Sequence, residues 1–203
     1  MTIAEQITRA KQDYDEVYNK GFADGRKDEH DAFWDTFQQN GKAINYRYAF
    51  IYDRFTDETF NPKYPLVCND DTSASQYMFY NSDLTSTKVP ITVVKDMSYT
   101  FNGADKLKTI VLLNIDENTS LYTHTFAGCT ALENITFEGV IGRNINFSAA
   151  SKLTHESVMS IINHLKDFSG TTTTRTLTLH ENVNALLTDS EKAIATQKGW
   201  TLA

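Results

Sequence analysis

A repeated pattern in the second half of the chain constrains the fold more than any other feature of the sequence. The twelve residues from Phe101 to Leu112 align with the twelve from Phe126 to Phe137. Both segments have an aromatic residue, then a small residue at the fourth position, leucine at the seventh, an aliphatic residue at the tenth and an apolar residue at the twelfth. Such internal similarity is typical of solenoids, in which each unit buries its apolar face only against its neighbours.

Two weaker copies of the pattern flank this pair. A third copy begins at Phe147 and keeps Ala150 and Leu153, but Glu156 and Val158 then occupy the last two apolar positions. An upstream copy is marked by Met78, Leu84, Val89 and Ile91. The leucines of the four copies are 23, 25 and 21 residues apart: Leu84, Leu107, Leu132 and Leu153. This period matches leucine-rich repeats of about 20 to 29 residues.

Each repeat is expected to form one coil of a solenoid. The alternating apolar positions predict short strands at 109–112 and 134–137. A turn or short helical segment should present the aromatic residue and the small residue of each unit. The small residue is needed because neighbouring coils pack closely at that position.

The segment from Phe126 to Phe137, read as Phe-x-Gly-Cys-x-x-Leu-x-x-Ile-x-Phe, resembles the BspA-type leucine-rich repeat of bacterial surface proteins and of some bacteriophage proteins. The resemblance covers residues 77–158. Because this repeat family is defined by its architecture, the resemblance implies a role in binding or scaffolding and names no partner.

The N-terminal segment has the pattern of a coiled-coil helix. Its apolar positions are spaced by 4, 3, 4 and 3 residues, as in an a/d seam: Ile3, Ile7, Ala10, Tyr14 and Val17. An isolated helix of this length is only marginally stable in water, so association with other copies would bury the seam. We expect a homo-oligomer, either a trimer or a dimer. The alternative is a single amphipathic helix that packs on its own domain.

Residues 43–67 are rich in aromatic side chains. Tyr46, Tyr48, Phe50 and Tyr52 alternate with other residues, which predicts a strand. An aromatic stripe of this kind favours core packing, and the alternative is a platform on which a carbohydrate stacks.

The C-terminal segment predicts a mixture of helices and strands. A helix is expected over 154–168, with Thr154 as its N-cap and a buried stripe of Val158, Ile161, Ile162 and Leu165. A strand at 176–179, a helix at 190–198 and a last strand at 200–202 should follow. This ending resembles the C-terminal segment of many leucine-rich-repeat proteins of gut bacteria and their phages, which implies that it caps the solenoid. The segments 21–25 and 33–41 resemble the leader of phage-encoded proteins of this kind.

Together these patterns predict an α+β fold, in which an N-terminal amphipathic or coiled-coil helix precedes a short leucine-rich-repeat solenoid with an α/β C-terminal cap. Four segments are expected. They are a helical oligomerisation segment at 1–40, an aromatic-rich β connector or N-terminal cap at 41–76, BspA-like repeats at 77–158 and a C-terminal cap at 159–203.

The sequence contains no motif for catalysis, metal binding or cofactor binding. The five histidines form no His-x-x-x-His pair, and there is no phosphate-binding glycine loop and no Gly-x-Ser-x-Gly elbow. Cys68 and Cys129 are interpreted as two small buried apolar residues. We therefore expect a protein that is not an enzyme and that needs no cofactor.

Charge and hydropathy argue against two classes of partner. The net charge is -7 and no basic cluster is present, so binding to nucleic acid is not expected. No apolar run approaches the roughly 20 residues of a membrane span, so membrane insertion is not expected either. The N-terminus lacks the features of a signal peptide, which predicts synthesis in the bacterial cytoplasm without export by the general route.

These observations favour a structural or interaction protein, specifically an oligomeric component of a phage virion, of the tail or fibre type, that displays the repeats. Its partner would be a protein or a surface glycan. One alternative is a phage-encoded intracellular inhibitor or adaptor that binds a host protein. A second alternative is a fragment of a bacterial surface adhesin.

Overall fold

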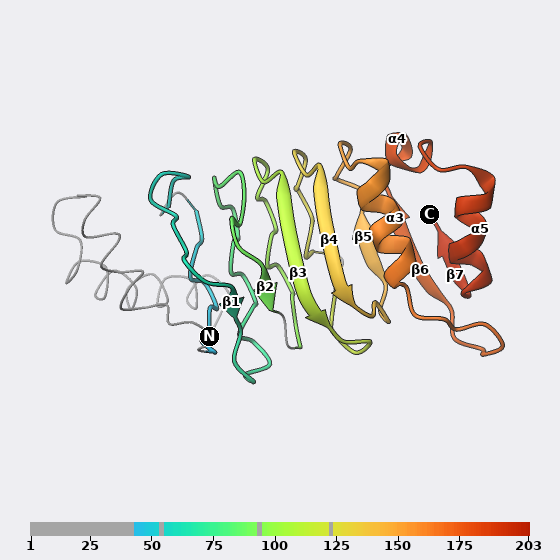
Figure 1. Cartoon of the computed structure of the whole chain (residues 1–203), viewed down its shortest axis with the longest axis horizontal. Helices are drawn as coiled ribbons and strands as arrows, with labels where there is room; N and C mark the ends of the chain where they lie inside the picture. The colour runs from blue at the N-terminus through green and yellow to red at the C-terminus, as the bar shows by residue number, and fades with distance from the viewer. Residues whose placement is uncertain (1–42, 53–54, 93–94, 122–123) are drawn as a thin grey trace, which may run out of the picture.

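The computed structural model describes residues 43–52, 55–92, 95–121 and 124–203. The elements succeed one another along the long axis of the molecule, from β1 to the C-terminal helix α5 and strand β7 (Figure 1). Their bounds are β1 Leu66–Val67, β2 Ile91–Thr92, β3 Thr109–Ile115, β4 Asn134–Gly139, β5 Ile145–Phe147, α3 His155–His164, β6 Arg175–Leu179, α4 Glu181–Asn184, α5 Asp189–Gln197 and β7 Trp200–Leu202. The coiled-coil segment expected at 1–40 lies outside the described residues.

One side of the solenoid, the strand side, is a parallel sheet in the order β1-β2-β3-β4. Each strand comes from a successive coil, and Ile91 pairs with Leu112 while Ile110 pairs with Ile135. The strands expected at 109–112 and 134–137 are confirmed, and both extend further towards the C-terminus. Their inward residues, such as Ile110 and Ile135, are buried because a parallel strand packs its apolar face on the core.

Close approach of two coils explains a glycine at the end of β4. Gly139 pairs with Ile115 and has a φ of 116°, a conformation that residues with a Cβ rarely adopt. A Cβ on Gly139 would lie 2.1 Å from the carbonyl oxygen of Ile115. The register of β3 and β4 shifts just before this pair, so the strands come together at a point where only glycine fits.

The opposite side of each coil, the turn side, consists of residues 46–52, 74–82, 97–104 and 124–129. In the first three of these segments, alternate residues donate their N–H to the next coil, and residues between them donate within their own coil. The N–H of Phe79 donates to the carbonyl of Thr100 at 2.7 Å, whereas the N–H of Tyr80 donates to Tyr77 of the same coil at 3.3 Å. The turns predicted to carry the aromatic and small residues are therefore present, and their backbone groups are satisfied by this alternation.

The strand predicted from Tyr46, Tyr48, Phe50 and Tyr52 is wrong, because residues 47–50 form turns. The alternation itself has a physical cause. All four residues donate their N–H to the next coil, to Ala74, Gln76, Met78 and Tyr80 respectively. Tyr48 and Tyr52 have positive φ angles, which an extended strand does not allow. Tyr46 and Phe50 are buried, so these two side chains pack in the core as expected.

A column of phenylalanine rings runs through the core beneath the turn side. We call Phe79, Phe101, Phe126 and Phe147 the inner stack. Their ring centroids are 5.5, 5.7 and 4.5 Å apart, and all four side chains are buried. The repeat pattern predicts Met78 at the first of these positions, but Phe79 is the residue that stacks on Phe101. The small residues Ala104, Cys129 and Ala150 are also buried, as the repeat template predicts.

Helix α3 takes the place of a strand beside β4. Thr154 caps the helix through its side chain, which accepts from the N–H of Ser157. The Ser157 hydroxyl donates to the carbonyl of Glu133 and accepts from the N–H of Ile135, so it pairs with the edge of β4. This arrangement explains why the third repeat departs from the template after Leu153. The predicted N-cap and the buried residues Val158, Ile161, Ile162 and Leu165 are confirmed, although the helix ends at His164 and not at residue 168.

The turn side continues at the C-terminal end as a second parallel sheet in the order β5-β6-β7. The strands expected at 176–179 and 200–202 and the helix expected at 190–198 are confirmed as β6, β7 and α5. Strand β5 and the short helix α4 were not predicted. Ile145 of β5 pairs with Leu177 of β6, and both side chains are buried in the same core as the strand side.

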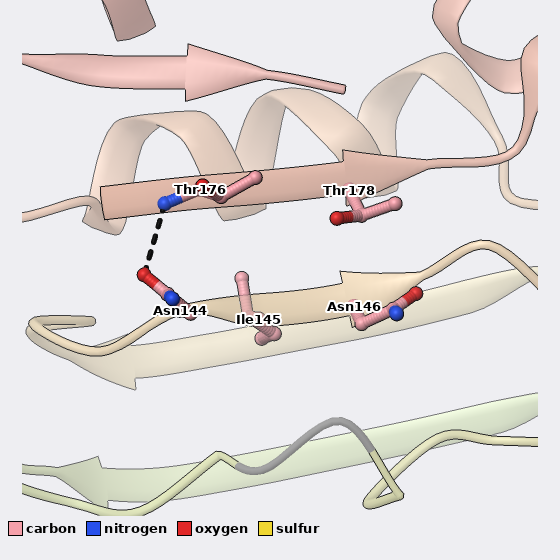
Figure 2. A pocket seen from close by; sticks show the side chains of 5 residues that line it. All are labelled: Asn144, Ile145, Asn146, Thr176 and Thr178. Atoms are coloured by element: carbon pink, nitrogen blue, oxygen red, sulfur yellow. Dashed lines mark hydrogen bonds between the residues drawn. The ribbon is translucent and has the colours of Figure 1, made fainter. Parts of the chain in front are cut away.

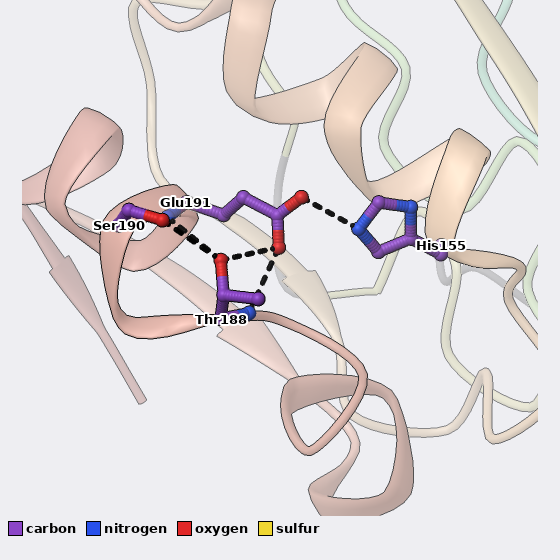
Figure 3. A network of polar contacts seen from close by, with 4 residues as sticks. All are labelled: His155, Thr188, Ser190 and Glu191. Atoms are coloured by element: carbon purple, nitrogen blue, oxygen red, sulfur yellow. Dashed lines mark hydrogen bonds and ion pairs between the residues drawn. The ribbon is translucent and has the colours of Figure 1, made fainter.

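A polar network connects α5 to α3 (Figure 3). The Glu191 carboxylate accepts hydrogen bonds from the N–H and the hydroxyl of Thr188, each at 2.8 Å, and forms a capping box with that residue. Its other oxygen lies 2.8 Å from Nε2 of His155 at the start of α3. The main-chain hydrogen bond from Thr188 is the largest cause that lowers the pKa of Glu191.

Candidate interaction surfaces

The reactive side chains of the described residues have structural roles. Cys68 and Cys129 are buried, and burial raises the pKa of each thiol to about 12, so neither is poised as a nucleophile. In the part of the chain that the structure describes, no three His, Cys, Asp or Glu side chains gather in a group able to hold a metal ion.

Each histidine of the described residues contacts a structural partner. The His124 ring stacks on Tyr99, and Nδ1 of His164 lies 2.7 Å from the carbonyl oxygen of Ser160. His180 caps α4 by accepting from the N–H of Asn182. His155 contacts Glu191, as described above. These contacts give each of these histidines a structural role in packing, capping or hydrogen bonding.

The outward face of the strand side is the first candidate surface. In the register of the sheet, Val67, Thr92 and Leu113 stand opposite one another, and Val111 stands opposite Thr136. Val67, Val111 and Leu113 are partly exposed, and Thr136 and Glu138 are exposed. The surface therefore has an apolar centre on β1 and β3, interrupted by Thr92 of β2, and a polar margin on β4.

A second column of aromatic rings lies on the turn side outside the main core, and two of its members are buried in a smaller hydrophobic cluster. We call Tyr48, Tyr77, Tyr99 and His124 the outer stack, whose ring centroids are 5.0, 4.8 and 4.8 Å apart. The three tyrosines have φ angles between 56° and 61°, in the left-handed region. Burial, the largest cause, and the neighbouring Tyr48 and Tyr99 raise the pKa of Tyr77, which keeps this phenol neutral.

The outer stack is poorly shaped for carbohydrate stacking. A sugar ring stacks on the face of an aromatic ring, whereas Tyr77 is held between Tyr48 and Tyr99 and Tyr99 between Tyr77 and His124. The faces of these inner members are thus occupied by each other. The aromatic residues of this region mainly stabilise coil-to-coil packing.

A shallow depression on the outward face of β5 and β6 is the third candidate surface (Figure 2). It is lined by Asn144, Ile145, Asn146, Thr176 and Thr178. Asn146 stands opposite Thr178 in the register, and Oδ1 of Asn144 accepts from the N–H of Thr176 at 3.0 Å. None of the five lining side chains is ionisable.

A comparison with models of protein families places these surfaces on a known architecture. The family model described as BspA type leucine rich repeat region (6 copies) matches residues 72–190. This match covers more than half of the 203 residues. The chain belongs to this family. No curated protein and no solved structure matched the chain in the corresponding searches.

Membership of the BspA-type family confirms the resemblance carried by Phe126 to Phe137. The matched region continues past residue 158 and includes α3, β6 and α4. The leucine-rich repeat is an interaction fold with no catalytic centre of its own, so a general role in protein interaction follows. Within the described residues, no helix combines the length and the apolar character of a membrane span.

The structure does not bear on the predicted oligomerisation residues, because Ile3, Ile7, Ala10, Tyr14 and Val17 lie outside the described residues. Sequence reasoning missed the outer stack and the polar depression. Each of the two features is accompanied by a short recurring pattern in the sequence. The spacing Tyr99-x-x-x-Gly103 recurs as Tyr77-x-x-x-Asn81, and Asn144 and Asn146 flank a buried isoleucine as Thr176 and Thr178 flank a buried leucine.

Proposed function

We propose that this protein is a non-enzymatic interaction module, and that it serves as an oligomeric component of a phage virion, of the tail or fibre type. The repeat solenoid would be the part that binds. The observation that carries the proposal is the partly exposed apolar centre of the strand side, formed by Val67 on β1 and by Val111 and Leu113 on β3, with Thr92 of β2 between them. Interfaces between proteins bury an apolar centre of this kind inside a polar margin.

The strand side offers a protein partner a rigid and regular surface. Val111 and Leu113 project outward from the same strand, and Glu138 lies on β4 at the margin. Because the inward residues Ile110 and Leu112 are buried in the core, the outward residues hold their positions without the partner. A preformed surface binds with a smaller entropic cost than one that must first become ordered.

Display in several copies would strengthen a weak contact. The proposed seam of Ile3, Ile7, Ala10, Tyr14 and Val17 would bring two or three solenoids together. A second binding event then becomes intramolecular, which raises the overall avidity without any new contact. This is the arrangement expected of a receptor-contacting fibre.

The oligomeric state of the full chain in solution tests the assembly. Ile7→Lys with Val17→Lys places two charges in the seam, and Gln12→Lys with Asn19→Lys places the same two charges on the opposite side of the same helical pattern. By light scattering, the wild type and the control pair should be trimers or dimers, and the seam pair should be a monomer. A monomeric wild type would overturn the oligomeric proposal.

Affinity capture tests the binding surface. Val111→Lys introduces a charge at the apolar centre, whereas Thr130→Lys introduces the same charge at an exposed turn position outside the strands. A host protein retained by the wild type and by Thr130→Lys should be lost with Val111→Lys. Equal retention by Val111→Lys would place binding elsewhere on the molecule.

An intracellular inhibitor or adaptor that binds a host protein is the second candidate. Its support is the acidic net charge of -7, which favours a partner with a basic surface. This candidate predicts a monomer that forms an equimolar complex with one host protein. The same light-scattering experiment, repeated with the captured protein, separates the two candidates.

A further inference from the structure

The outward face of the second sheet differs in chemistry from that of the first. Across the three strands, Asn144 stands beside Thr176, and Thr176 pairs with Thr201 of β7. One step along β5 and β6, Asn146 pairs with Thr178. Neighbouring strands lie about 4.8 Å apart and residues on one face of a strand about 6.6 Å apart, so these groups form a flat polar array.

The two asparagines present donors to this array. Oδ1 of Asn144 accepts from the N–H of Thr176 at 3.0 Å, and Oδ1 of Asn146 accepts from the N–H of Ser148 at 2.8 Å. These bonds fix the orientation of both amides. The NH₂ groups of both asparagines therefore remain to donate hydrogen bonds to a ligand in the depression (Figure 2).

The turn at Asn146 does not itself require asparagine. In three other turns of the Asx-x-Ser type, aspartate accepts the same bond from the serine N–H, at Asp71, Asp96 and Asp167. Aspartate would serve the turn equally well at position 146. Asparagine adds an NH₂ donor and removes a negative charge from the depression, which suits an uncharged ligand that accepts hydrogen bonds there.

We propose that the depression between β5 and β6 binds a neutral saccharide. Its hydroxyl groups would accept hydrogen bonds from the NH₂ groups of Asn144 and Asn146 and exchange hydrogen bonds with the hydroxyls of Thr176 and Thr178. This inference deepens the proposed function and rests on it, because it names the ligand class of one surface of the same binding module.

The lining selects a saccharide over other ligands. No ionisable side chain lines the depression, so a charged group bound there would lose water without gaining a counter-charge. A protein partner anchors through apolar side chains in apolar pockets, but Ile145, the only apolar residue of the lining, is 2% exposed. Sugar hydroxyls both donate and accept, which matches a surface of amide donors and threonine hydroxyls.

Nuclear magnetic resonance of the full-length ¹⁵N-labelled protein tests the site. The side-chain amide signals of Asn144 and Asn146 are followed while glucose, galactose, mannose, fucose and N-acetylglucosamine are added one at a time, with N-acetylneuraminic acid as the anionic comparison. At least one neutral sugar should shift both signals in a saturable manner. We expect a dissociation constant of about 1 mM, as is ordinary for a few hydrogen bonds on an open surface.

Matched variants assign the effect to the depression. Asn146→Asp keeps the turn and replaces the NH₂ donor by a charge, and should weaken binding at least about tenfold. Asn182→Asp makes the same chemical change on exposed α4 and should leave binding unchanged. Thr178→Val, which keeps the shape of the side chain and removes its hydroxyl, should also weaken binding, and it serves if Asn146→Asp fails to fold.

Three results would overturn the proposal. They are the absence of a saturable shift with every neutral sugar, a shift with the anionic sugar alone, and unchanged affinity in a folded Asn146→Asp or Thr178→Val protein. These failures are separable from a failure of the proposed function, because light scattering of the seam variants and capture by Val111→Lys do not depend on the depression.

Discussion

The strand side and the turn side of this solenoid stack the same coils in two different ways. On the strand side, extended residues pair directly between β3 and β4, and side chains alternate between core and solvent. On the turn side, alternate N–H groups of the first three coils reach the next coil, and residues between them close turns within their own coil. A parallel ladder of hydrogen bonds between coils therefore does not require strands on both sides of the solenoid.

The two sides also differ in what stabilises them. The strand side depends on aliphatic residues such as Ile110 and Ile135, whereas the turn side adds an inner and an outer stack of aromatic rings. The outer stack includes three tyrosines with positive φ, a conformation that costs roughly 1–2 kcal/mol per residue. Aromatic pairs contribute about 0.5–1.5 kcal/mol each, so stacking and strain nearly cancel there.

The largest expected effect concerns the inner stack. Phe101→Ala should lower the free energy of unfolding by about 3–5 kcal/mol, because the ring is fully buried between Phe79 and Phe126 and leaves a cavity. Urea denaturation measures the change. Tyr99→Ala, two residues away in the outer stack, is the control and should cost clearly less. Equal losses at the two positions would contradict the distinction between the stacks.

On the strand side, the position most sensitive to substitution is a close backbone contact between two coils. Gly139→Ala should cost about 2–4 kcal/mol, the sum of a strained φ and a clash of the new Cβ with the backbone of Ile115. Gly170→Ala is the control, since Gly170 also has a positive φ but no atom lies within 4 Å of its added Cβ. If the two variants unfold at the same urea concentration, the close approach of the coils contributes nothing.

A smaller effect should separate strain from stacking in the outer stack. Tyr99→Gly and Tyr99→Ala both remove the ring, but only glycine accepts the φ of 61° without a penalty. Tyr99→Gly should therefore be more stable than Tyr99→Ala by about 1 kcal/mol. The thermal midpoints of the two variants decide the matter, and a more stable alanine variant would mean that the backbone of this coil relaxes once the ring is gone.

The smallest effect on stability is expected at the C-terminal end of the solenoid, at the contact between α5 and α3. The pKa of Glu191 is lowered in the folded protein, mainly by the hydrogen bond from the N–H of Thr188. Its contribution to stability is therefore present above the unfolded pKa of about 4.3 and is lost as the pH falls through the lower folded pKa.

Thermal midpoints between pH 7 and pH 3 measure this contribution. The wild type should lose more stability on acidification than Glu191→Gln, and Glu181→Gln on the neighbouring helix α4 should behave as the wild type does. Parallel pH profiles for the wild type and Glu191→Gln would show that the capping box does not depend on the charge.

Much of the fold follows from local patterns. The pattern of Phe101 to Leu112 and Phe126 to Phe137 predicts the coils, because each buried position has one fixed place in the template. The C-terminal elements were predictable for a similar reason, since Thr154 and Gly199 mark element ends through capping and turn chemistry that depend on a few neighbouring residues. The residues 1–40 keep their predicted coiled coil as a hypothesis.

The predictions from the sequence are wrong or incomplete where a residue's conformation depends on a neighbouring coil. Alternation at Tyr46, Tyr48, Phe50 and Tyr52 predicts a strand, yet the same period results from hydrogen bonds of alternate residues to the coil that follows. Met78 and Phe79 are adjacent and both apolar, so only stacking against Phe101 distinguishes them.

The sequence by itself determined the repeat family, the order of α3, β6, α5 and β7, and the buried positions of the two units that fit the template closely, because these depend on periodicity and on short-range capping. Only the tertiary structure decided that α3 replaces a strand beside β4, that tyrosines stack outside the main core, and that Asn144 and Asn146 face a common depression with Thr176 and Thr178. Such features join residues one or more coils apart, and their energies depend on contacts that no local pattern records.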